Sequence, residues 1–155
     1  MQDQNIALSR RTFLGAAALA ASSMVPGRAL AAAGKPDSCF AGVQIGVITY
    51  SFRSLPGSAE DLLKYLKQCG ISSVELMGGP AEAFARAASP TEDGHASMEG
   101  FKALRKLYND AGVNIHIVKF GSIGNGGMSD EQIEYYFEAA KALGARGITR
   151  ELSEG

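Results

Sequence analysis

Apolar and polar residues follow two different periods along the chain from residue 43 onward. Runs rich in β-branched residues predict strands. These runs lie at residues 43–50, 71–77, 113–120 and 147–152. Between them, apolar residues recur at helical spacing, which predicts crossover helices. The helical stretches are 58–69, 98–111 and 129–143, with a helical turn around 81–88.

Capping residues mark where these helices begin and end. Ser58 with Asp61, and Ser129 with Gln132, have the spacing of a capping box. A glycine closes each helix one or two residues before the next strand begins. Helix, glycine and strand repeat in the stretches 69–76, 111–118 and 143–150. This is a repeated βα unit, so we expect a parallel sheet with right-handed crossovers. Residues 34–42 are predicted to be an irregular lead-in.

Two architectures are built from consecutive βα units: an open doubly wound sheet and a (β/α)8 barrel. The turn after the first strand, residues 50–57, lacks the glycine fingerprint of a dinucleotide-binding sheet. A complete barrel needs eight units and typically about 250 residues. We therefore predict an α/β fold of parallel (β/α) units, with residues 43–155 forming about four strands, the N-terminal half of a TIM barrel.

The first 33 residues have the features of an export signal. Arg10 and Arg11 form a twin-arginine pair within residues 9–14, and an Ala-rich apolar stretch follows over 13–25. Small residues at 29–33 offer cleavage sites. The signal resembles those read by the twin-arginine translocation machinery, which implies a periplasmic or otherwise exported protein. No apolar run reaches 18 residues, so no stable membrane span is expected after cleavage.

The charge and the cysteine content of the chain argue against nucleic-acid binding, a disulfide scaffold and a structural zinc site. The formal net charge is -1, from 15 basic and 16 acidic side chains. Residues 1–33 hold three arginines and one aspartate, so the remainder has 12 basic and 15 acidic side chains and a net charge of -3. Nucleic-acid binding usually requires a basic face, so we expect no nucleic-acid partner. Two cysteines are too few for a disulfide scaffold or a four-ligand zinc site.

Three short motifs resemble the xylose isomerase-like TIM barrels, which include the sugar phosphate isomerases/epimerases. Residues 46–53, Gly-Val-Ile-Thr-Tyr-Ser-Phe-Arg, look like their opening strand. Residues 70–77, Gly-Ile-Ser-Ser-Val-Glu-Leu-Met, are similar to their second strand. Residues 142–148 are like the approach to their fourth strand. The resemblance covers residues 43–155.

The resemblance implies a metal-dependent isomerase or epimerase of a sugar or sugar-like polyol. In such enzymes the metal ligands usually come from the later strands, so no ligand is assigned in this chain. A divalent ion such as Mn²⁺ or Mg²⁺ is expected for the full-length protein. The chain alone is expected to be inactive and poorly soluble or self-associating. The alternative is a non-catalytic exported carbohydrate-binding barrel, and an endonuclease-type barrel is disfavoured by export and charge.

Barrel active sites lie at the C-terminal ends of the strands, which selects candidate substrate-binding residues. Tyr50 and Phe52 close the first predicted strand and would either stack on a sugar ring or plug the barrel mouth. Glu75 alternates with Val74 and Leu76, so it should point into the barrel. It would hold a substrate hydroxyl, brace a metal ligand, or pair with a buried Arg or Lys.

The later strands add three more candidates. His116 is predicted to turn inward with Asn114 and Val118, as a core residue or a substrate ligand. Lys119 should face outward by strict alternation, although it lies near the active end of its strand. Glu151, near the end of the fourth strand, is a candidate substrate, supporting or metal-binding group.

The remaining features of interest are in loops. His95 is expected to be solvated in the long connection after the second strand. The glycine-rich stretch 121–127 lacks the Lys-Ser/Thr ending of a P-loop and is interpreted as a flexible loop over the active face. Cys39 and Cys69 would be able to oxidise together after export, but nothing in the sequence places them within bridging distance.

Overall fold

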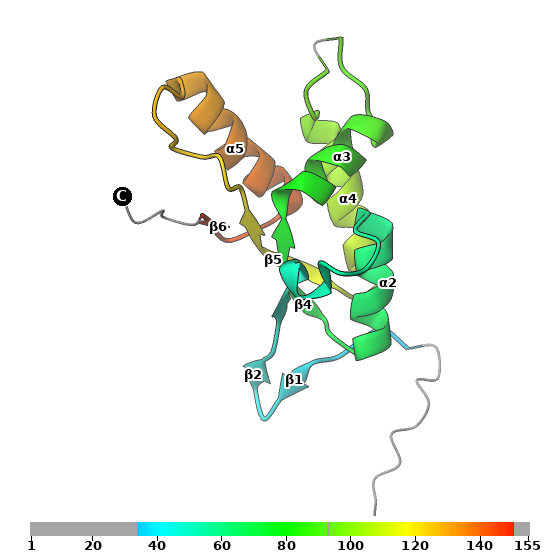
Figure 1. Ribbon diagram of the computed structural model, residues 1–155. Helices are drawn as coiled ribbons and strands as arrows, with labels where there is room; N and C mark the ends of the chain where they lie inside the picture. Colours follow the sequence, from blue (N-terminus) through cyan, green and yellow to red (C-terminus); the bar gives the residue numbers. More distant parts are fainter. Residues whose placement is uncertain (1–33, 93, 151–155) are drawn as a thin grey trace, which may run out of the picture. The chain divides into compact units, whose positions relative to one another are not determined.

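The computed structural model describes residues 34–92 and 94–150. The signal-like residues 1–33, Arg10 and Arg11 among them, lie outside this part, as does Glu151. Helices and strands alternate along the chain after an initial hairpin (Figure 1). The elements are β1 Cys39–Phe40, β2 Val43–Gln44, β3 Val47–Ile48, the 3-10 helix η1 Thr49–Phe52, α2 Ala59–Cys69, β4 Ser73–Met77, α3 Gly78–Ala88, α4 Met98–Asp110, β5 Asn114–Lys119, α5 Asp130–Leu143 and β6 Ile148–Thr149.

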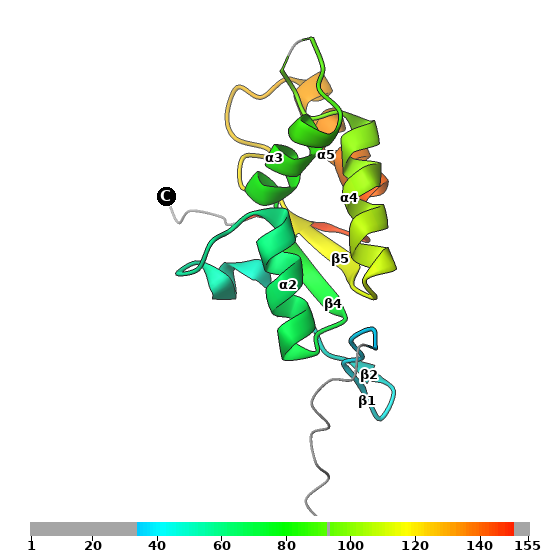
Figure 2. The ribbon, with the colours of Figure 1, turned by 90° about the vertical axis from the view of Figure 1, so that its right-hand side faces the viewer.

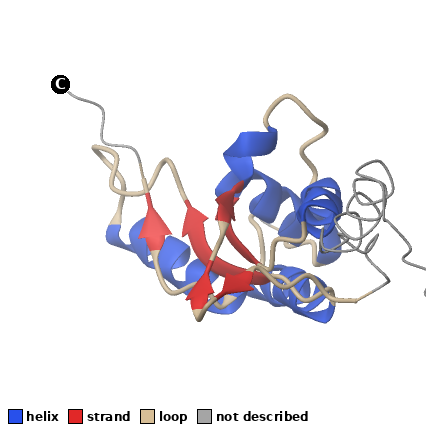
Figure 3. Ribbon diagram, turned by 90° about the horizontal axis from the view of Figure 1, so that it is seen from below, coloured by secondary structure: helices blue, strands red, loops and turns tan. Residues whose placement is uncertain are grey.

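The four later strands form one parallel sheet in the order β3-β4-β5-β6. Strand order therefore follows chain order, without the reversal that defines a doubly wound sheet. Figure 3 shows the strands side by side, with helices packed around them. Sequential parallel strands joined by helices are the arrangement of one half of a (β/α)8 barrel. The predicted fold class is confirmed.

Helices α2, α4 and α5 pack on one face of this sheet. Their apolar residues form a single buried cluster with Val74 and Leu76 of β4 and Ile115 and Val118 of β5. All four strand residues have at most 1% of their surface exposed. Helices α3 and α4 lie side by side in both views (Figures 1 and 2), and α4 also packs against α5. This face of the sheet holds the hydrophobic core.

The predicted helix ends are confirmed in atomic detail. The Ser58 hydroxyl accepts from the Asp61 backbone N–H at 3.1 Å, and Ser129 with Gln132 forms a complete capping box. Gly70 and Gly144 close α2 and α5 in the left-handed conformation, with φ of 70° and 76°.

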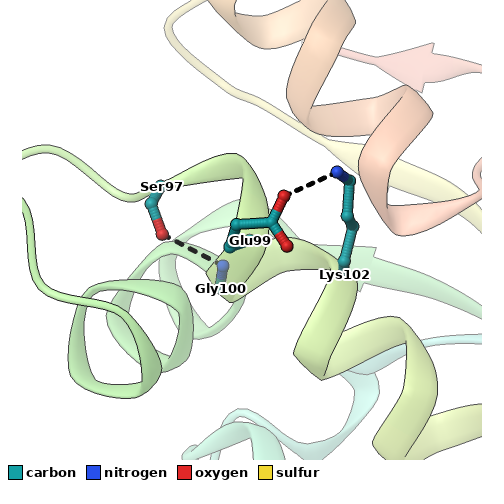
Figure 4. A network of polar contacts seen from close by, with 4 residues as sticks. All are labelled: Ser97, Glu99, Gly100 and Lys102. Atoms are coloured by element: carbon teal, nitrogen blue, oxygen red, sulfur yellow. Dashed lines mark hydrogen bonds and ion pairs between the residues drawn. The ribbon is translucent and has the colours of Figure 1, made fainter.

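The N-terminus of α4 adds a cap that the sequence pattern did not predict. The Ser97 hydroxyl accepts from the Gly100 N–H at 3.0 Å (Figure 4). In the same first turns of the helix, Lys102 and Glu99 pair at 2.7 Å on the exposed side (Figure 4).

The first predicted strand is shorter than expected, and it is preceded by a hairpin. Only β3 joins the parallel sheet, whereas β2 pairs antiparallel with β1, so the lead-in is not wholly irregular. The buried Ser38 fastens this hairpin, because its hydroxyl donates to the Ile45 carbonyl at 2.6 Å and accepts from the Ser72 N–H at 2.9 Å. Beyond β3, the Thr49 hydroxyl accepts from the Met77 N–H at 3.0 Å. Where η1 begins, the Thr49 side chain thus takes the place of a backbone carbonyl as the acceptor for the Met77 N–H.

Helix α3 is longer than predicted, because the stretch Gly78-Gly79-Pro80 is its first turn and not a loop. Proline is tolerated in a first turn, where its missing N–H needs no partner. A Cβ on Gly78 would lie 2.5 Å from the Phe120 ring and 2.8 Å from the Lys119 carbonyl oxygen. Glycine therefore lets the helix start directly after β4, close against the end of β5.

Candidate functional site

The face of the sheet opposite the helices contains a hollow of about 360 Å³. Its lining comes from the start of the parallel sheet and from the middle of β4 and β5. The lining residues are Gln44, Gly46, Val47, Ile48, Ser73, Val74, Glu75, His116 and Ile117. We call this surface the inner face, because it corresponds to the inside of a closed barrel. It brings together two of the predicted site residues, Glu75 and His116.

Glu75 lies on the inner face in the orientation that alternation predicts. Val74 and Leu76 on either side are buried against the helices, whereas Glu75 is half-buried. One carboxylate oxygen accepts from the Thr149 hydroxyl of β6 at 2.6 Å. A carboxylate has further lone pairs and can accept several hydrogen bonds at once. The contact across the sheet therefore fixes the side chain and leaves it able to accept from a ligand.

A register shift in β5 changes which of its residues face inward. Val74 aligns with Ile115, but Glu75 aligns with Ile117, which leaves His116 as an extra residue. Alternation resumes after the shift, so Val118 aligns with Leu76 and is buried among the helices.

The prediction that Val118 turns inward is therefore wrong, and so is the outward prediction for Lys119. Lys119 aligns with Met77 on one side and Thr149 on the other, two residues along β5 from the partner of Glu75, so it lies on the same face of the sheet as Glu75. His116 does line the inner hollow, as predicted. Its role as a ligand or core residue stays a prediction.

Tyr50 and Phe52 belong to η1 and do not close a strand. Tyr50 is 53% exposed, and the Arg53 guanidinium lies 5.0 Å from the centre of its ring. Phe52 is half-buried and packs on Tyr65 with ring centres 5.6 Å apart. Tyr50 thus remains about half exposed with Arg53 over its ring, whereas Phe52 is part of the packing beside the core.

Residues 34–92 and 94–150 contain no preformed metal site. No three side chains of His, Cys, Asp or Glu come together there in a way that would hold an ion. Cys39 and Cys69 are both exposed and are not bonded to each other. Across the same residues no helix has the length and apolarity needed to cross a membrane.

A second and larger pocket, of about 570 Å³, lies between α3, α5 and residues 91 and 95–98. Its lining includes Glu82 and Arg86 of α3, Tyr135 and Tyr136 of α5, and His95. Burial raises the pKa of Glu82, and the nearby charges of Arg86 and His95 oppose that rise. Burial, reinforced by the Glu82 charge, raises the pKa of Tyr135 to about 12.

Sequence reasoning missed this pocket. His95 is exposed as predicted, yet its ring lies 6.2 Å from that of Tyr135. The only signal in the sequence is the spacing of Glu82 and Arg86, four residues apart on one helix face. Surface ion pairs have the same spacing, so the pattern alone does not indicate a pocket.

Comparison with known proteins gives similarity of fold at low sequence identity. No protein-family profile matches the sequence, and no curated protein matches it. One similar solved structure is the probable 3-DHS dehydratase AsbF of Bacillus anthracis, involved in petrobactin synthesis. It has a TM-score of 0.48 and 16% identity, over 70% of this chain and 38% of that one.

Another is a sugar phosphate isomerase/epimerase from Parabacteroides distasonis. It has a TM-score of 0.44 and 18% identity, over 77% of this chain and 42% of that one. The chain thus spans about two fifths of the length of either structure. At these TM-scores and identities the two structures carry no argument about the chemistry of this chain.

Proposed function

We propose that this chain is part of a TIM-barrel isomerase or epimerase that acts on a sugar or a sugar-like polyol. The observation that supports it is the Glu75 carboxylate, held by Thr149 on the inner face of a sequential parallel sheet. The sequence motifs at 46–53, 70–77 and 142–148 favour the same function. The activity, substrate and partners of the whole protein are proposals throughout.

The proposed reaction moves a proton between carbons beside a carbonyl group, with carboxylates as acid and base. Glu75 would accept a hydrogen bond from a substrate hydroxyl while the Thr149 hydroxyl keeps the carboxylate oriented. Lys119, on the same face of the sheet as Glu75, would add a positive charge near the substrate oxygens. Tyr50 is exposed on the turn that follows β3 and would contact an apolar ring face.

A divalent ion, Mn²⁺ or Mg²⁺, is proposed for the full-length protein. When bound, such an ion polarises carbonyl and hydroxyl oxygens. The described residues do not supply a ligand cluster, so its ligands would come from elsewhere in the protein. Removal of divalent ions with EDTA should abolish turnover, and Mn²⁺ or Mg²⁺ should restore it.

Deuterium wash-in tests the proposed activity. The full-length protein is incubated in D2O with a panel of aldoses, ketoses and inososes (keto-inositols), and loss of the C–H signal beside the carbonyl is followed by NMR. We expect exchange with at least one sugar, and a fall of about tenfold or more in Glu75→Gln, because hydrogen bonds to charged groups contribute about 1.5–3 kcal/mol. Glu99→Gln, which alters an exposed carboxylate on α4, is the control.

Exchange that is unchanged in Glu75→Gln would contradict the role of the inner face. The second candidate, a non-catalytic carbohydrate-binding barrel, is favoured by the exposed Tyr50 ring. It predicts binding of the same sugars without any wash-in. Residues 34–155 expressed alone should show no exchange, which is measured in the same assay.

Export by the twin-arginine pathway is a separate proposal. It rests on Arg10 and Arg11 and on the apolar stretch 13–25. The replacement of both arginines by lysine should keep a fused reporter in the cytoplasm, whereas the unaltered leader should export it. Export of the double variant at the normal level would refute this pathway.

A further inference from the structure

The pocket between α3 and α5 is separate from the inner face. It has no lining residue in common with the inner hollow. Its volume of about 570 Å³ lies within the range of ordinary small-molecule sites. Of the two helices that line it, α3 begins directly after β4, and α5 begins after the loop 120–129 that follows β5.

Two tyrosine rings, with their planes inclined at 71°, line one side of this pocket. Tyr135 and Tyr136 meet edge to face, with ring centres 5.4 Å apart. The Tyr135 hydroxyl donates to the Ala96 carbonyl at 3.1 Å, and the Tyr136 ring packs on Phe120 at 4.8 Å. The hydroxyl of Tyr135 is thus used within the fold. What it offers a ligand is ring surface.

Charged groups of both signs line the pocket beside these tyrosine rings. Glu82 and Arg86 lie one turn apart on α3, and Glu131 and Gln132 lie in the first turn of α5. The Glu82 carboxylate accepts hydrogen bonds, and the Arg86 guanidinium donates them in pairs. An anionic ligand would meet the two glutamates, and a cationic ligand would meet Arg86. The arrangement suits a neutral ligand that donates and accepts at neighbouring positions.

We propose that this pocket binds a neutral polyhydroxylated ring, a sugar or a cyclitol. One apolar face of the ligand ring stacks on the Tyr135 ring, which Tyr136 braces edge to face, and adjacent hydroxyls bind Glu82 and Arg86. The site does not depend on the function proposed for the inner face.

The two histidines of the sequence make the two sites distinguishable. His95 lines the pocket between α3 and α5, and His116 lines the inner hollow. NMR spectra of the histidine rings in the full-length protein, recorded during titration with D-xylose and with myo-inositol, report on each site separately. Any further histidines in the full-length protein are distinguished by assigning these two signals with His95→Gln and His116→Gln. We expect the His95 signal to move in a saturable way with at least one of the two compounds.

Matched variants test the proposed contacts. Glu82→Gln should weaken binding by about tenfold or more, because it removes the charged acceptor. Tyr135→Phe should change the dissociation constant by less than about twofold, since it keeps the ring face. Glu99→Gln, outside the lining, should bind normally. Glu75→Gln should leave the ligand-induced shift of the His95 signal unchanged, even if it abolishes the shift of the His116 signal.

Three results would overturn the proposal. The first is a His95 signal that neither compound moves, whatever happens at His116. The second is equal binding by Glu82→Gln and the unaltered protein. The third is a shift of His95 by inorganic phosphate or ethylamine at lower concentration than by the polyols, which would show that the ligand class is wrong.

Discussion

The two faces of strand β4 differ in what surrounds them, although they are built from alternate residues of one short segment. Val74 and Leu76 are completely enclosed by helices, whereas Glu75 and Met77 face the inner side and are half-buried. The enclosed face is part of the hydrophobic core, and the inner face contains the hydrogen bond from Thr149 to Glu75. The difference indicates that stability depends mainly on one face, while the chemistry of a ligand would depend on the other.

The largest expected effect is on the enclosed face. Leu76→Ala should lower the free energy of unfolding by about 2–5 kcal/mol, because it leaves a cavity in a packed core. Urea denaturation measures this value. Leu55→Ala alters a side chain that is 50% exposed and should cost less than about 0.5 kcal/mol. Similar costs for the two leucine variants would contradict the assigned core.

A smaller loss in the free energy of unfolding is expected where helices α3 and α4 approach closely. A Cβ on Gly100 of α4 would lie 2.2 Å from the Ala85 carbonyl oxygen of α3. Gly100→Ala should therefore destabilise by about 1–3 kcal/mol, even though alanine is the better helix former. Gly79→Ala is the matched control, since nothing lies within 4 Å of its added Cβ. Stabilisation by Gly100→Ala would disprove the close contact.

The smallest effect concerns the pocket and appears as a dependence of stability on pH. The pKa of Glu82 is raised in the folded protein by burial, so the folded state binds more protons than the unfolded state just above the ordinary pKa of 4.5. Ionisation of Glu82 therefore reduces stability as the pH rises from 4.5 through the raised pKa. Glu82→Gln should show a flatter profile in that window than Glu99→Gln. Thermal melts between pH 4 and 7 check this, and identical profiles would contradict the burial of Glu82.

Local signals in the sequence were enough to predict most of the fold. Ser58, Ser129, Gly70 and Gly144 act through neighbours only a few residues away, so their roles as caps can be predicted without the fold. The parallel sheet followed from the repeat of helix, glycine and strand. The orientation of Glu75 followed from alternation within a regular strand.

Features that depend on distant contacts were not predicted. The extra residue His116 arises from the pairing of β5 with β4, so strict alternation placed Val118 and Lys119 on the wrong faces. The start of α3 at Gly78 depends on the space beside Phe120. The pocket between α3 and α5 combines Glu82 of one helix with Tyr135 of another. No local sequence pattern predicts that these two residues line the same pocket.

The central claim is that function and stability are assigned to opposite faces of β4. The most direct test compares Glu75→Gln with the mild core variant Leu76→Val in the full-length protein, by deuterium wash-in and urea denaturation together. We predict that Glu75→Gln loses wash-in with little change in its unfolding midpoint. Leu76→Val should lower the midpoint and keep the wash-in rate per folded molecule. Normal wash-in by Glu75→Gln, or loss of wash-in by folded Leu76→Val, would contradict the claim.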